Sequence, residues 1–578
     1  MTPLEVLQTY WHYDNFRPLQ AEIIQSVLEG DDTLALMPTG GGKSLCFQVP
    51  TMVMDGLCLV VTPLIALMKD QVENLRKRDI RAAAIYTGMT YDQQKTVINN
   101  CKYGPYHFLY ISPERLESSD FREQLPQLPI TFIAVDEAHC ISQWGYDFRP
   151  FYLHIAQIRQ LLSSKRRVPI LALTATATPD VIDDIQDRLE FRQHHVLRKS
   201  FERPNLSYVV RLSNKKADEI VHILSRVPGS AIVYVRNRQR AKELSEYLVQ
   251  QGLSADYYHA GLTTQQRNDK QMAWIENCTR VIVCTNAFGM GIDKPDVRVV
   301  IHHDLPDTVE AYFQEAGRAG RDGQQAYAVL LYDPSDKTKA RQRVADNFPT
   351  KEFVEDVYHK TCDYLCIGVE SGEGHSFYLD VGDLCHVMHL PILPTFSALR
   401  LLTNAGYIRF QEEQDIQPRV QIVITRQEIE QYHLEPILND LLEYLMRNYA
   451  GIFTELQYLS SAQHIQEYLA QMTGRSKRQI DIHSLLVSLA QRHIIRYVPR
   501  TVANILTMTR DRQQEIYLTT AVYKQRQEQY TQRLRSMVEY AENQQFCRSQ
   551  VLLAYFGETD APACGTCDVC RRRKKEMA

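Results

Sequence analysis

The chain lacks the features by which membrane, secreted and fibrous proteins are recognised. Among its 578 residues no apolar run approaches the roughly 18 residues that span a membrane. No basic segment followed by an apolar stretch opens the sequence, so we expect no secretion signal. Low-complexity tracts and fixed-period repeats are also missing. These absences, with 44% hydrophobic and 23% charged residues, favour a globular, cytoplasmic protein of several domains.

A positive net charge is missing too. The formal net charge is −4, which by itself argues against a nucleic-acid partner. Only the contacting face of a multidomain protein must be basic, however. Between Arg475 and Glu515 there are eight Lys or Arg against three Asp or Glu, and Arg571–Lys575 is basic throughout. Each segment is either a solvated face or a surface that contacts phosphate.

Up to about residue 340, short apolar runs alternate with amphipathic helical stretches. Near-continuous apolar strands separated by helices are typical of parallel sheets buried on both faces. Nine expected strands fall into two series on either side of Arg203-Pro-Asn205, which predicts two doubly wound α/β domains, 1–204 and 205–344. The expected strands are Thr33–Met37, Leu57–Thr62, His107–Ile111, Ile130–Val135 and Ile170–Thr174, then Ala231–Val235, Val281–Cys284, Val299–Ile301 and Ala328–Tyr332.

Beyond about residue 345 the pattern becomes mainly helical. Two stretches each predict a helix followed by a hairpin, the typical ending of a winged helix-turn-helix module. In the first, Tyr407–Phe410 would pair with Val420–Ile424; in the second, Ile494–Val498 would pair with Ile505–Met508. We therefore expect winged-helix-like units at 345–425 and 426–510. A last segment, 511–578, would begin with a polar, Gln-rich helix running to about residue 546.

A glycine-rich stretch, Met37 to Ser44, contains the first expected strand end. The glycines Gly40–Gly42 allow backbone N–H groups to approach phosphates closely. Lys43 would reach the β- and γ-phosphates, and the Ser44 hydroxyl would ligate Mg²⁺. Met37 stands where the phosphate-loop pattern has its first glycine, so Gly-Lys-Ser by itself is a weak signal.

Two carboxylates, Asp136 and Glu137, follow the apolar run Ile130–Val135. In a nucleoside triphosphatase, one carboxylate at such a strand end holds Mg²⁺ and its neighbour orients the attacking water. We assign the metal to Asp136 and the water to Glu137. Alone, the pair is typical of a solvated turn. Together with the phosphate loop, it predicts a nucleotide-hydrolysing site.

The segment Tyr312–Arg321 of the second domain carries further polar candidates. Arg318 and Arg321 stand three residues apart among small residues and can approach a phosphate bound by the first domain. They are candidate arginine fingers, and Gln314 belongs to the same candidate catalytic set. A surface arginine pair is the plain alternative. If the fingers come from the other domain, hydrolysis requires the cleft to close.

Thirteen cysteines occur in a chain without a secretion signal, where a tight cluster indicates metal ligands rather than disulfides. Four of them follow the spacing C-x16-C-x2-C-x2-C: Cys547, Cys564, Cys567 and Cys570. Four thiolates form a closed tetrahedral site for structural Zn²⁺, with no open position for catalysis. Buried cysteines without a metal are the alternative. A looser set is expected in a core: Cys362, Cys366 and Cys385.

Together these motifs resemble the RecQ-type DNA helicases of helicase superfamily 2. The resemblance covers residues 7–335 almost motif for motif, and residues 547–570. It implies two RecA-like domains, ATP as the substrate, Mg²⁺ and a structural Zn²⁺. It also implies that Tyr13 and Arg17 flank the adenine, that Gln20 bonds the edge of the base and that Asp293 contacts the ribose.

The stretch Ser142–Arg149 resembles the aromatic loop of this family, which senses single-stranded DNA and triggers hydrolysis. Its rings would stack on unpaired bases, at roughly 1–3 kcal/mol per base, although an aromatic core turn is the alternative. RNA helicases with a similar D-E-A-x motif lack this loop, which favours DNA. The DNA-binding and coupling residues implied are His139, Trp144, Tyr146, Phe148, Arg149 and Thr174.

One departure from the family pattern affects the duplex-binding surface. In many relatives the zinc module follows the motor directly, whereas here a long stretch intervenes and the zinc ligands come last. We expect the module to fold back against the second motor domain. The Gln411–Arg419 wing is acidic, so the Arg496–Arg500 hairpin is the better candidate for contacting or parting duplex DNA.

The sequence thus predicts an ATP- and Mg²⁺-dependent helicase that translocates on single-stranded DNA, unwinds duplexes and serves recombination and repair. The 3′→5′ polarity comes from the resemblance alone. Expected partners are single-stranded and duplex DNA, single-strand-binding proteins and repair proteins, with nucleoid association in a bacterium. Two alternatives stay open: a DNA-stimulated ATPase that remodels protein–DNA complexes, and a DNA-binding or annealing scaffold.

Overall fold

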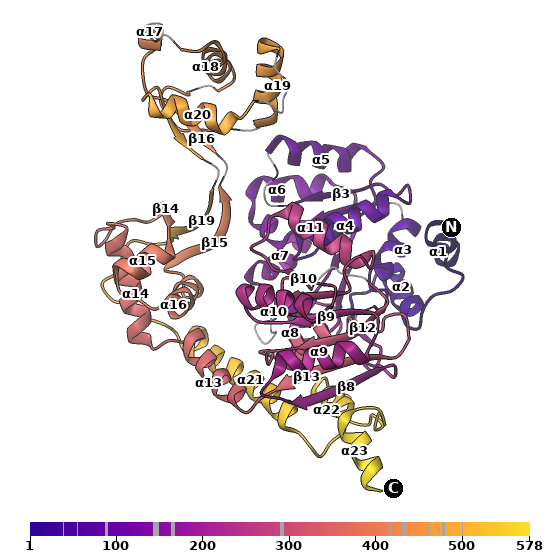
Figure 1. Cartoon of the computed structure of the whole chain (residues 1–578). Coiled ribbons are helices and arrows are strands. Elements are labelled where there is room, and N and C mark those ends of the chain that lie inside the picture. Colours follow the sequence, from indigo (N-terminus) through magenta and orange to yellow (C-terminus); the bar gives the residue numbers. More distant parts are fainter. Residues whose placement is uncertain are drawn as a thin grey trace. The chain divides into compact units, whose positions relative to one another are not determined.

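The computed structural model describes the whole chain except residues 39, 55, 87–88, 90, 143–148, 163–167, 290–293, 417, 430–431, 433, 450, 460–461, 475, 477–479, 500 and 578. It divides into a first unit, Met1–Val344 with Glu528–Ala578, and a second unit, Ala345–Gln527 (Figure 1). None of the described helices combines the length and apolarity needed to cross a membrane.

The first lobe of unit 1 is a seven-stranded parallel sheet in the order β3-β4-β2-β5-β6-β1-β7. Its strands are β1 (Thr33–Leu36), β2 (Leu57–Val61), β3 (Ala82–Ile85), β4 (Phe108–Ile111), β5 (Ile130–Val135), β6 (Ile170–Thr174) and β7 (Val196–Arg198). On one face pack α1 (Pro3–Trp11), α2 (Gln20–Glu29), α3 (Leu45–Val53) and α4 (Ile65–Arg76). On the other pack α5 (Tyr91–Tyr103), α6 (Ser119–Gln124), α7 (His154–Leu162) and α8 (Pro179–Arg188).

The second lobe is a six-stranded parallel sheet in the order β10-β11-β9-β12-β13-β8. Its strands are β8 (Leu206–Leu212), β9 (Ser230–Tyr234), β10 (Ala255–Tyr258), β11 (Val281–Cys284), β12 (Val297–His302) and β13 (Ala326–Tyr332). Helices α9 (Lys216–Arg226) and α10 (Arg238–Gln250) cover one face, and α11 (Thr264–Ile275) and α12 (Val309–Ala316) cover the other. Two doubly wound RecA-like lobes are therefore confirmed.

The sequence predicts the nine inner strands of these sheets but not β3, β7, β8 and β10. These four are the edge strands of the two sheets. An edge strand is less enclosed than an inner one and tolerates small or charged residues. Accordingly β3 is Ala-Ala-Ala-Ile, and β8 ends with two exposed residues, Arg211 and Leu212. Their apolar runs are too short or too interrupted to stand out.

Two antiparallel helices connect the lobes to the rest of the chain. Helix α13 (Ser335–Asn347) leaves unit 1, and α21 (Arg526–Glu542) returns beside it (Figure 1). Glu542 fixes the returning helix, because it accepts hydrogen bonds from the Tyr332 hydroxyl at 2.8 Å and from the Lys337 ammonium at 2.9 Å. Helices α22 (Arg548–Tyr555) and α23 (Asp568–Glu576) then pack near β8 of the second lobe. The expected return of the cysteine-rich segment to this lobe is confirmed.

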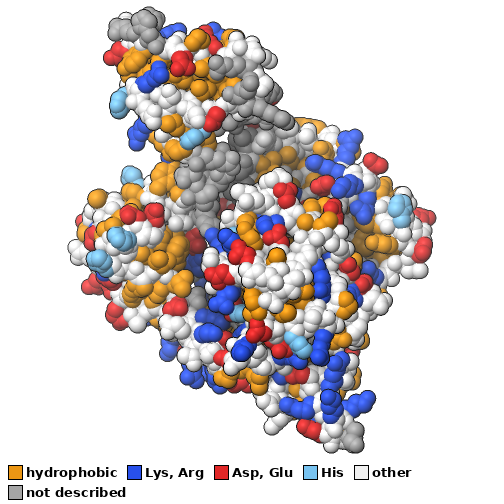
Figure 2. Space-filling model, in the orientation of Figure 1, with side chains coloured by type: hydrophobic (Ala, Val, Ile, Leu, Met, Phe, Trp, Pro, Cys, Tyr) orange, Lys and Arg blue, Asp and Glu red, His pale blue; other side chains and the backbone are white. Residues whose placement is uncertain are grey.

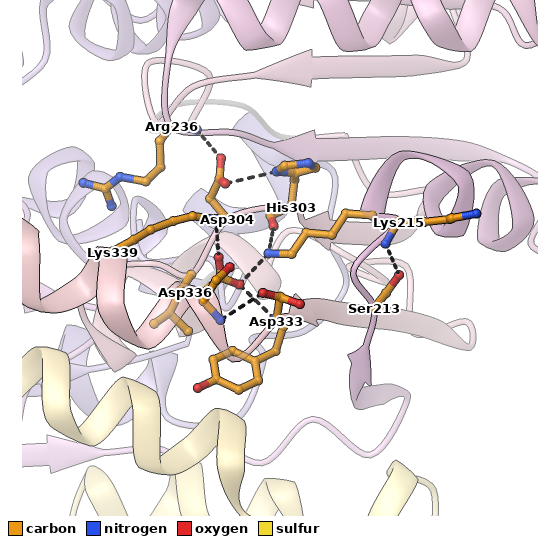
Figure 3. Close-up of polar contacts among 12 residues, drawn as sticks. Ser213, Lys215, Arg236, His303, Asp304, Asp333, Asp336 and Lys339 are labelled. Carbon is orange, nitrogen blue, oxygen red and sulfur yellow. Dashed lines mark hydrogen bonds and ion pairs between the residues drawn. The ribbon is translucent and has the colours of Figure 1, made fainter.

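A buried polar network fixes the start of α13 (Figure 3). The Lys216 ammonium donates to the His303 carbonyl at 2.7 Å and to Asp336 at 2.6 Å. Asp336 also accepts from the backbone N–H of Asp333 at 2.9 Å. Because Lys216 and Asp336 are both buried, each needs the other's charge. The network therefore ties the carboxyl edge of the second sheet to the exit from unit 1.

Unit 2 contains a winged-helix core with three helices and a three-stranded antiparallel sheet. Its elements are α14 (Lys351–Tyr364), β14 (Ser376–Leu379), α15 (Val381–Val387), α16 (Ile392–Asn404), β15 (Ile408–Ile416) and β19 (Thr501–Met508). The strand order is β14-β19-β15. The hairpin expected between Tyr407–Phe410 and Val420–Ile424 is wrong, because β15 pairs with β19, far along the chain.

A second winged-helix module is inserted in the wing of the first, between β15 and β19. Its elements are β16 (Arg419–Ile422), α17 (Arg426–Ile429), α18 (Pro436–Asn448), β17 (Gln457–Tyr458), α19 (Ala462–Thr473), α20 (Ile482–Gln491) and β18 (Ile495–Val498). The strand order β17-β16-β18 repeats that of the first core. Here, however, the central strand β16 comes first in the chain, so the module is circularly permuted. The expected pairing of Ile494–Val498 with Ile505–Met508 is therefore also wrong.

Two smaller expectations fail for local reasons. The Gln-rich helix does not span 511–546, because α21 starts only at Arg526 after a short π-helical turn, Ala521–Gln525. Before that turn, Leu518 is buried in the first winged-helix core, which holds the chain there. Cys362 and Cys385 are core residues as expected, but Cys366 is exposed just after α14.

Candidate nucleotide and zinc sites

The phosphate loop joins β1 to α3 and is braced by the start of α2 and the segment before it. Gln20 Nε2 donates to the carbonyls of Gly41 and Gly42 at 3.4 and 3.0 Å, and Arg17 donates to the Gly40 carbonyl at 2.7 Å. Gly42 has a φ of +82°, and a Cβ there would lie 2.4 Å from Gln20 Nε2. The loop conformation therefore requires glycine at this position.

A cavity of about 560 Å³ opens beside this loop. Tyr13, 51% exposed, lies on its wall with Arg17 and Gln20, so the three residues expected to hold the base line one space. Ser44 lies on the wall as well. Further lining residues are Gln71 and Asn74 of α4 and Arg78, which follows that helix. The sequence does not single out Asn74 and Arg78, because their spacing carries no nucleotide-binding signature.

The two carboxylates lie at the carboxyl end of β5. Glu137 adopts a left-handed conformation with φ +48°, unusual for a residue with a side chain, and a short 3-10 turn follows. Burial and the adjacent Glu137 charge raise the pKa of Asp136 to about 6. Burial acts on Glu137 in the same direction, but nearby cations, Lys43 first, outweigh it and lower the pKa of Glu137. Glu137 is thus held ionised 3.9 Å from the Lys43 ammonium.

A polar link runs from Glu137 into the first lobe. His139 Nδ1 lies 3.4 Å from Glu137 Oε2 and 2.9 Å from the Thr174 hydroxyl. Thr174 ends β6, and its oxygen also accepts from the Thr176 backbone N–H at 3.3 Å. His139 and Thr174 are both fully or almost fully buried. A displacement of the loop after β6 would therefore reach Glu137 through one imidazole.

The arginine pair of the second lobe lies near the phosphate loop. Helix α12 is capped by Thr308, whose hydroxyl accepts from the Ala311 N–H at 3.0 Å, and the turn after it carries Arg318 and Arg321. A Cβ built on Gly40 would lie 3.3 Å from Arg321 Cγ, so Arg321 reaches the loop itself. Arg318 is 5% exposed and contributes to the depressed pKa of Glu137. Gln314, on α12, is also buried.

The ends of the aromatic loop are anchored in the first lobe. Ser142 donates to Asp184 of α8 at 2.6 Å, and Arg149 donates to the Pro63 carbonyl at 3.3 Å. The Arg149 N–H also donates to the Cys140 carbonyl at 2.8 Å, so both ends of the loop start from neighbouring backbone. Four of the predicted site residues lie outside the described part of the chain: Trp144, Tyr146, Phe148 and Asp293.

The four C-terminal cysteines converge. Their four Sγ atoms all lie within 4.8 Å of one another, those of Cys547, Cys564, Cys567 and Cys570. A tetrahedral Zn²⁺ with Zn–S bonds near 2.3 Å needs sulfur separations of about 3.8 Å. The Cys547–Cys564 and Cys547–Cys567 sulfurs are 3.4 and 4.0 Å apart, so the donor set fits this ion. An ion pair between Arg548 and Asp568, at 3.0 Å, joins the two halves of the cluster.

Basic side chains gather on α23, beyond the last cysteine. Arg571–Lys575 is exposed throughout, and Figure 2 shows the Lys and Arg side chains near the C-terminal end of unit 1. In the inserted module, Arg492 and Arg496 are exposed on and next to β18. Of the other members of the expected basic segment, Arg510 and Arg512 follow β19 of the first winged-helix core, and the remaining four lie outside the described part of the chain.

Four family models match the chain in order. They are "DEAD/DEAH box helicase" at residues 17–185, "Helicase conserved C-terminal domain" at 215–323, "RecQ helicase winged-helix domain, Bacteroidota" at 420–499 and "RecQ zinc-binding" at 504–571. The third range runs from the second residue of β16 to the residue after β18. The model for a winged-helix domain thus coincides with the inserted module.

Relatives agree with these models. The probable ATP-dependent DNA helicase RecS of Bacillus subtilis is 43% identical over 366 residues, which are 62% of this chain and 72% of that protein. ATP-dependent DNA helicase RecQ of Pasteurella multocida is 40% identical over 395 residues, 66% of this chain but only 62% of that protein. The crystal structure of the helicase MrfA bound to DNA has a TM-score of 0.50 at 17% identity, covering 71% of this chain and 61% of that one. At this identity it shows a shared fold alone.

Proposed function

Since the chain belongs to the RecQ-type helicases of superfamily 2, we propose that it is an ATP-dependent 3′→5′ DNA helicase that acts in recombination and repair. The main support for this proposal is that one lobe supplies the phosphate loop and the carboxylates, while the other supplies Arg321, which lies against Gly40. A site completed by two lobes couples hydrolysis to their relative movement.

In this proposal Lys43 neutralises the β- and γ-phosphates, and the loop N–H groups hold them in place. Asp136 and Ser44 offer hard oxygen ligands to Mg²⁺, which would supply charge stabilisation to the transferring phosphoryl group. The ionised Glu137 orients and deprotonates the attacking water. Arg318 and Arg321 stabilise the charge that develops on the γ-phosphate, and Gln314 supports the same turn. Tyr13, Arg17, Gln20 and Asp293 hold the nucleoside.

The coupling to DNA follows the polar link from Glu137. We assign the aromatic loop, with Trp144, Tyr146 and Phe148, to stacking on unpaired bases. Its ends meet the first lobe at Ser142 and Arg149, next to the segment that carries His139. Contact of the loop with a DNA strand would then reposition His139, and with it Glu137. Single-strand-binding and repair proteins are the proposed protein partners, and the cytoplasm the proposed location, nucleoid-associated in a bacterium.

The test is the ATPase rate of the purified protein without nucleic acid and with single-stranded DNA, duplex DNA or RNA, combined with unwinding of a forked duplex. We expect single-stranded DNA to stimulate hydrolysis most and 3′-tailed forks to be unwound. Stimulation without unwinding would instead favour an ATPase that remodels protein–DNA complexes. Annealing of complementary strands without ATP, and no stimulated hydrolysis, would favour a scaffold. An ATPase rate unaffected by any nucleic acid would rule the helicase out.

A further inference from the structure

The linker between the two lobes makes contacts that the proposed function does not use. After β7 the chain passes through Lys199–Asn205 into β8. A linker that only connects two lobes needs no specific partners. Here Arg203 and Asn205 both donate side-chain hydrogen bonds to the turn that follows α12, where the candidate arginine fingers stand.

Arg203 grips the backbone of that turn. Its guanidinium donates to the carbonyls of Gly317, Ala319 and Gly320 at 3.2, 2.9 and 3.0 Å. Asn205 Nδ2 donates to the Gly320 carbonyl at 2.7 Å and to the Gln324 carbonyl at 2.9 Å.

The turn also has little freedom of its own. Gly320 has a φ of +62°, and a Cβ there would lie 2.6 Å from Asn205 Nδ2 and 2.8 Å from the Ala326 Cβ. The carbonyls that Arg203 holds flank Arg318 and stand just before Arg321. The linker therefore fixes the backbone from which both fingers project.

The zinc module holds the same linker from the other side. Glu558 follows α22 and accepts from the Ser200 hydroxyl at 2.7 Å and from the Phe201 N–H at 2.9 Å. Arg198, the last residue of β7, lies 3.5 Å from Glu558 and also donates to the Phe556 carbonyl. These contacts join α22 to the linker by charged and neutral hydrogen bonds.

An aromatic cluster completes the connection. The ring of Phe201 in the linker lies 5.3 Å from Phe556 of the zinc module and 6.0 Å from Phe313 of α12, and Phe313 and Phe556 are 5.0 Å apart. All three rings are buried. Edge-on and tilted ring pairs at these distances are stabilising. Linker, zinc module and finger-bearing helix therefore share one small core.

We propose that Arg203 is a positioning residue for Arg318 and Arg321, and that Glu558 holds the linker so that the zinc module supports the ATPase site at a distance. The inference rests on the proposed role of the two arginines as fingers. In this proposal the zinc module has a second function besides its own folding, which is to support the ATPase site through the linker. If the arginine fingers are held in place before ATP binds, less of the free energy of ATP binding is needed to order their side chains.

The test uses the full-length protein with saturating single-stranded oligodeoxynucleotide. For Arg203→Ala we expect kcat for ATP to fall about tenfold while KM changes less than about twofold, because a finger acts in the transition state. Arg203→Lys, which keeps the positive charge but places its donors on a single nitrogen, should recover part of the loss and serves if the alanine variant does not fold. Glu558→Gln should lower kcat about threefold with the zinc content unchanged. Exposed Arg226→Ala and Asp560→Asn are the matched controls, with unchanged kcat.

A double-variant cycle separates positioning from general destabilisation. In an Arg321→Ala background, measured in single turnover, Arg203→Ala should cost less than about twofold, because the finger that it positions is already gone. A full tenfold further loss would mean that Arg203 acts only on folding, and would overturn the inference. Normal kcat in Arg203→Ala, with activity lost in Arg321→Ala, would also overturn it and leave the proposed function intact. Normal kcat in Arg321→Ala would overturn both.

Discussion

The motor unit (unit 1) and the winged-helix unit (unit 2) differ in how far their functional side chains are exposed to solvent. In unit 1 the polar groups at the nucleotide site are close together and largely shielded from solvent: Glu137, His139 and Thr174 are buried, and Asp136 is partly exposed. In the inserted module the basic side chains Arg492 and Arg496 stand in solvent on a small apolar core. A buried, preorganised cluster is suited to catalysis, and an exposed basic face to the phosphate backbone. The comparison predicts that changes in unit 1 act on turnover and changes in the inserted module act on substrate choice.

The largest effect is expected for Lys43→Ala in the motor unit. Removal of the ammonium takes a positive charge from the phosphates and from Glu137, 3.9 Å away. We expect DNA-stimulated ATPase and unwinding to fall at least a hundredfold. Steady-state ATPase assays measure this, with exposed Lys242→Ala as the control. A variant with normal DNA-stimulated hydrolysis would show that the nucleotide site is assigned to the wrong loop.

The next effect is expected at the zinc cluster, which belongs to the motor unit in space. Cys567→Ser removes one of four ligands, and a structural zinc site rarely tolerates this. Bound zinc should fall from one to near zero per chain, with earlier proteolysis at the C-terminal end. Atomic absorption and limited proteolysis check this, with the exposed Cys278→Ser as the control. Full zinc content in Cys567→Ser would show that the cysteines do not form a four-ligand site.

Trp144→Ala tests whether DNA sensing belongs to the motor unit. Loss of one stacking ring should reduce stimulation of the ATPase by single-stranded DNA about tenfold, while affinity for the strand changes less because other contacts remain. Fluorescence anisotropy gives the affinity and an ATPase titration gives the stimulation. If both curves match the wild type, the sensing role has to be assigned elsewhere.

Removal of the inserted module sharpens the comparison most directly. Ile416 pairs with Thr501, so residues 417–500 can be replaced by Asn-Gly, the two-residue turn that closes such hairpins. We expect ATPase stimulated by single-stranded DNA to stay within about twofold, and binding and unwinding of forked duplexes to fall several-fold. Loss of the single-strand-stimulated ATPase would show that the two units are not separable.

The smallest effect is expected for Arg496→Glu on β18. An exposed phosphate contact contributes to affinity through counterion release, so the variant should weaken duplex binding a few-fold and lower its salt dependence. Binding titrations at several salt concentrations measure both, with Arg226→Glu as the control. Unchanged binding at low salt would remove this strand from the duplex surface.

Prediction from sequence succeeded where local pattern and covalent order decide the structure. The inner strands are continuous apolar runs, and their pairing in parallel sheets follows from alternation with helices, so both RecA-like lobes could be expected. The edge strands were missed because pairing with one neighbouring strand, and not a continuous apolar run, makes them strands. Short sequence motifs identify the phosphate loop, the carboxylates and the four cysteines. Each motif can be recognised without knowledge of the fold.

Prediction failed where partners lie far apart in the chain. An antiparallel strand can pair with any suitable neighbour, and nothing in Tyr407–Phe410 distinguishes β19 from the nearer β16. Likewise, Arg203 looks like a boundary in the sequence because its three partners stand more than a hundred residues further on. Asn74 and Arg78 line the nucleotide cavity only through the packing of α4.

The permuted order of strands in the inserted module has an evolutionary consequence. Since β16 and β18 are hydrogen-bonded neighbours, the first and last residues of the inserted module lie side by side. A module with adjacent ends can be inserted into the tight turn of a hairpin by a single recombination event, without disturbing the strands of that hairpin. Related helicases can then gain, lose or exchange such a winged-helix module while the two RecA-like lobes stay unchanged.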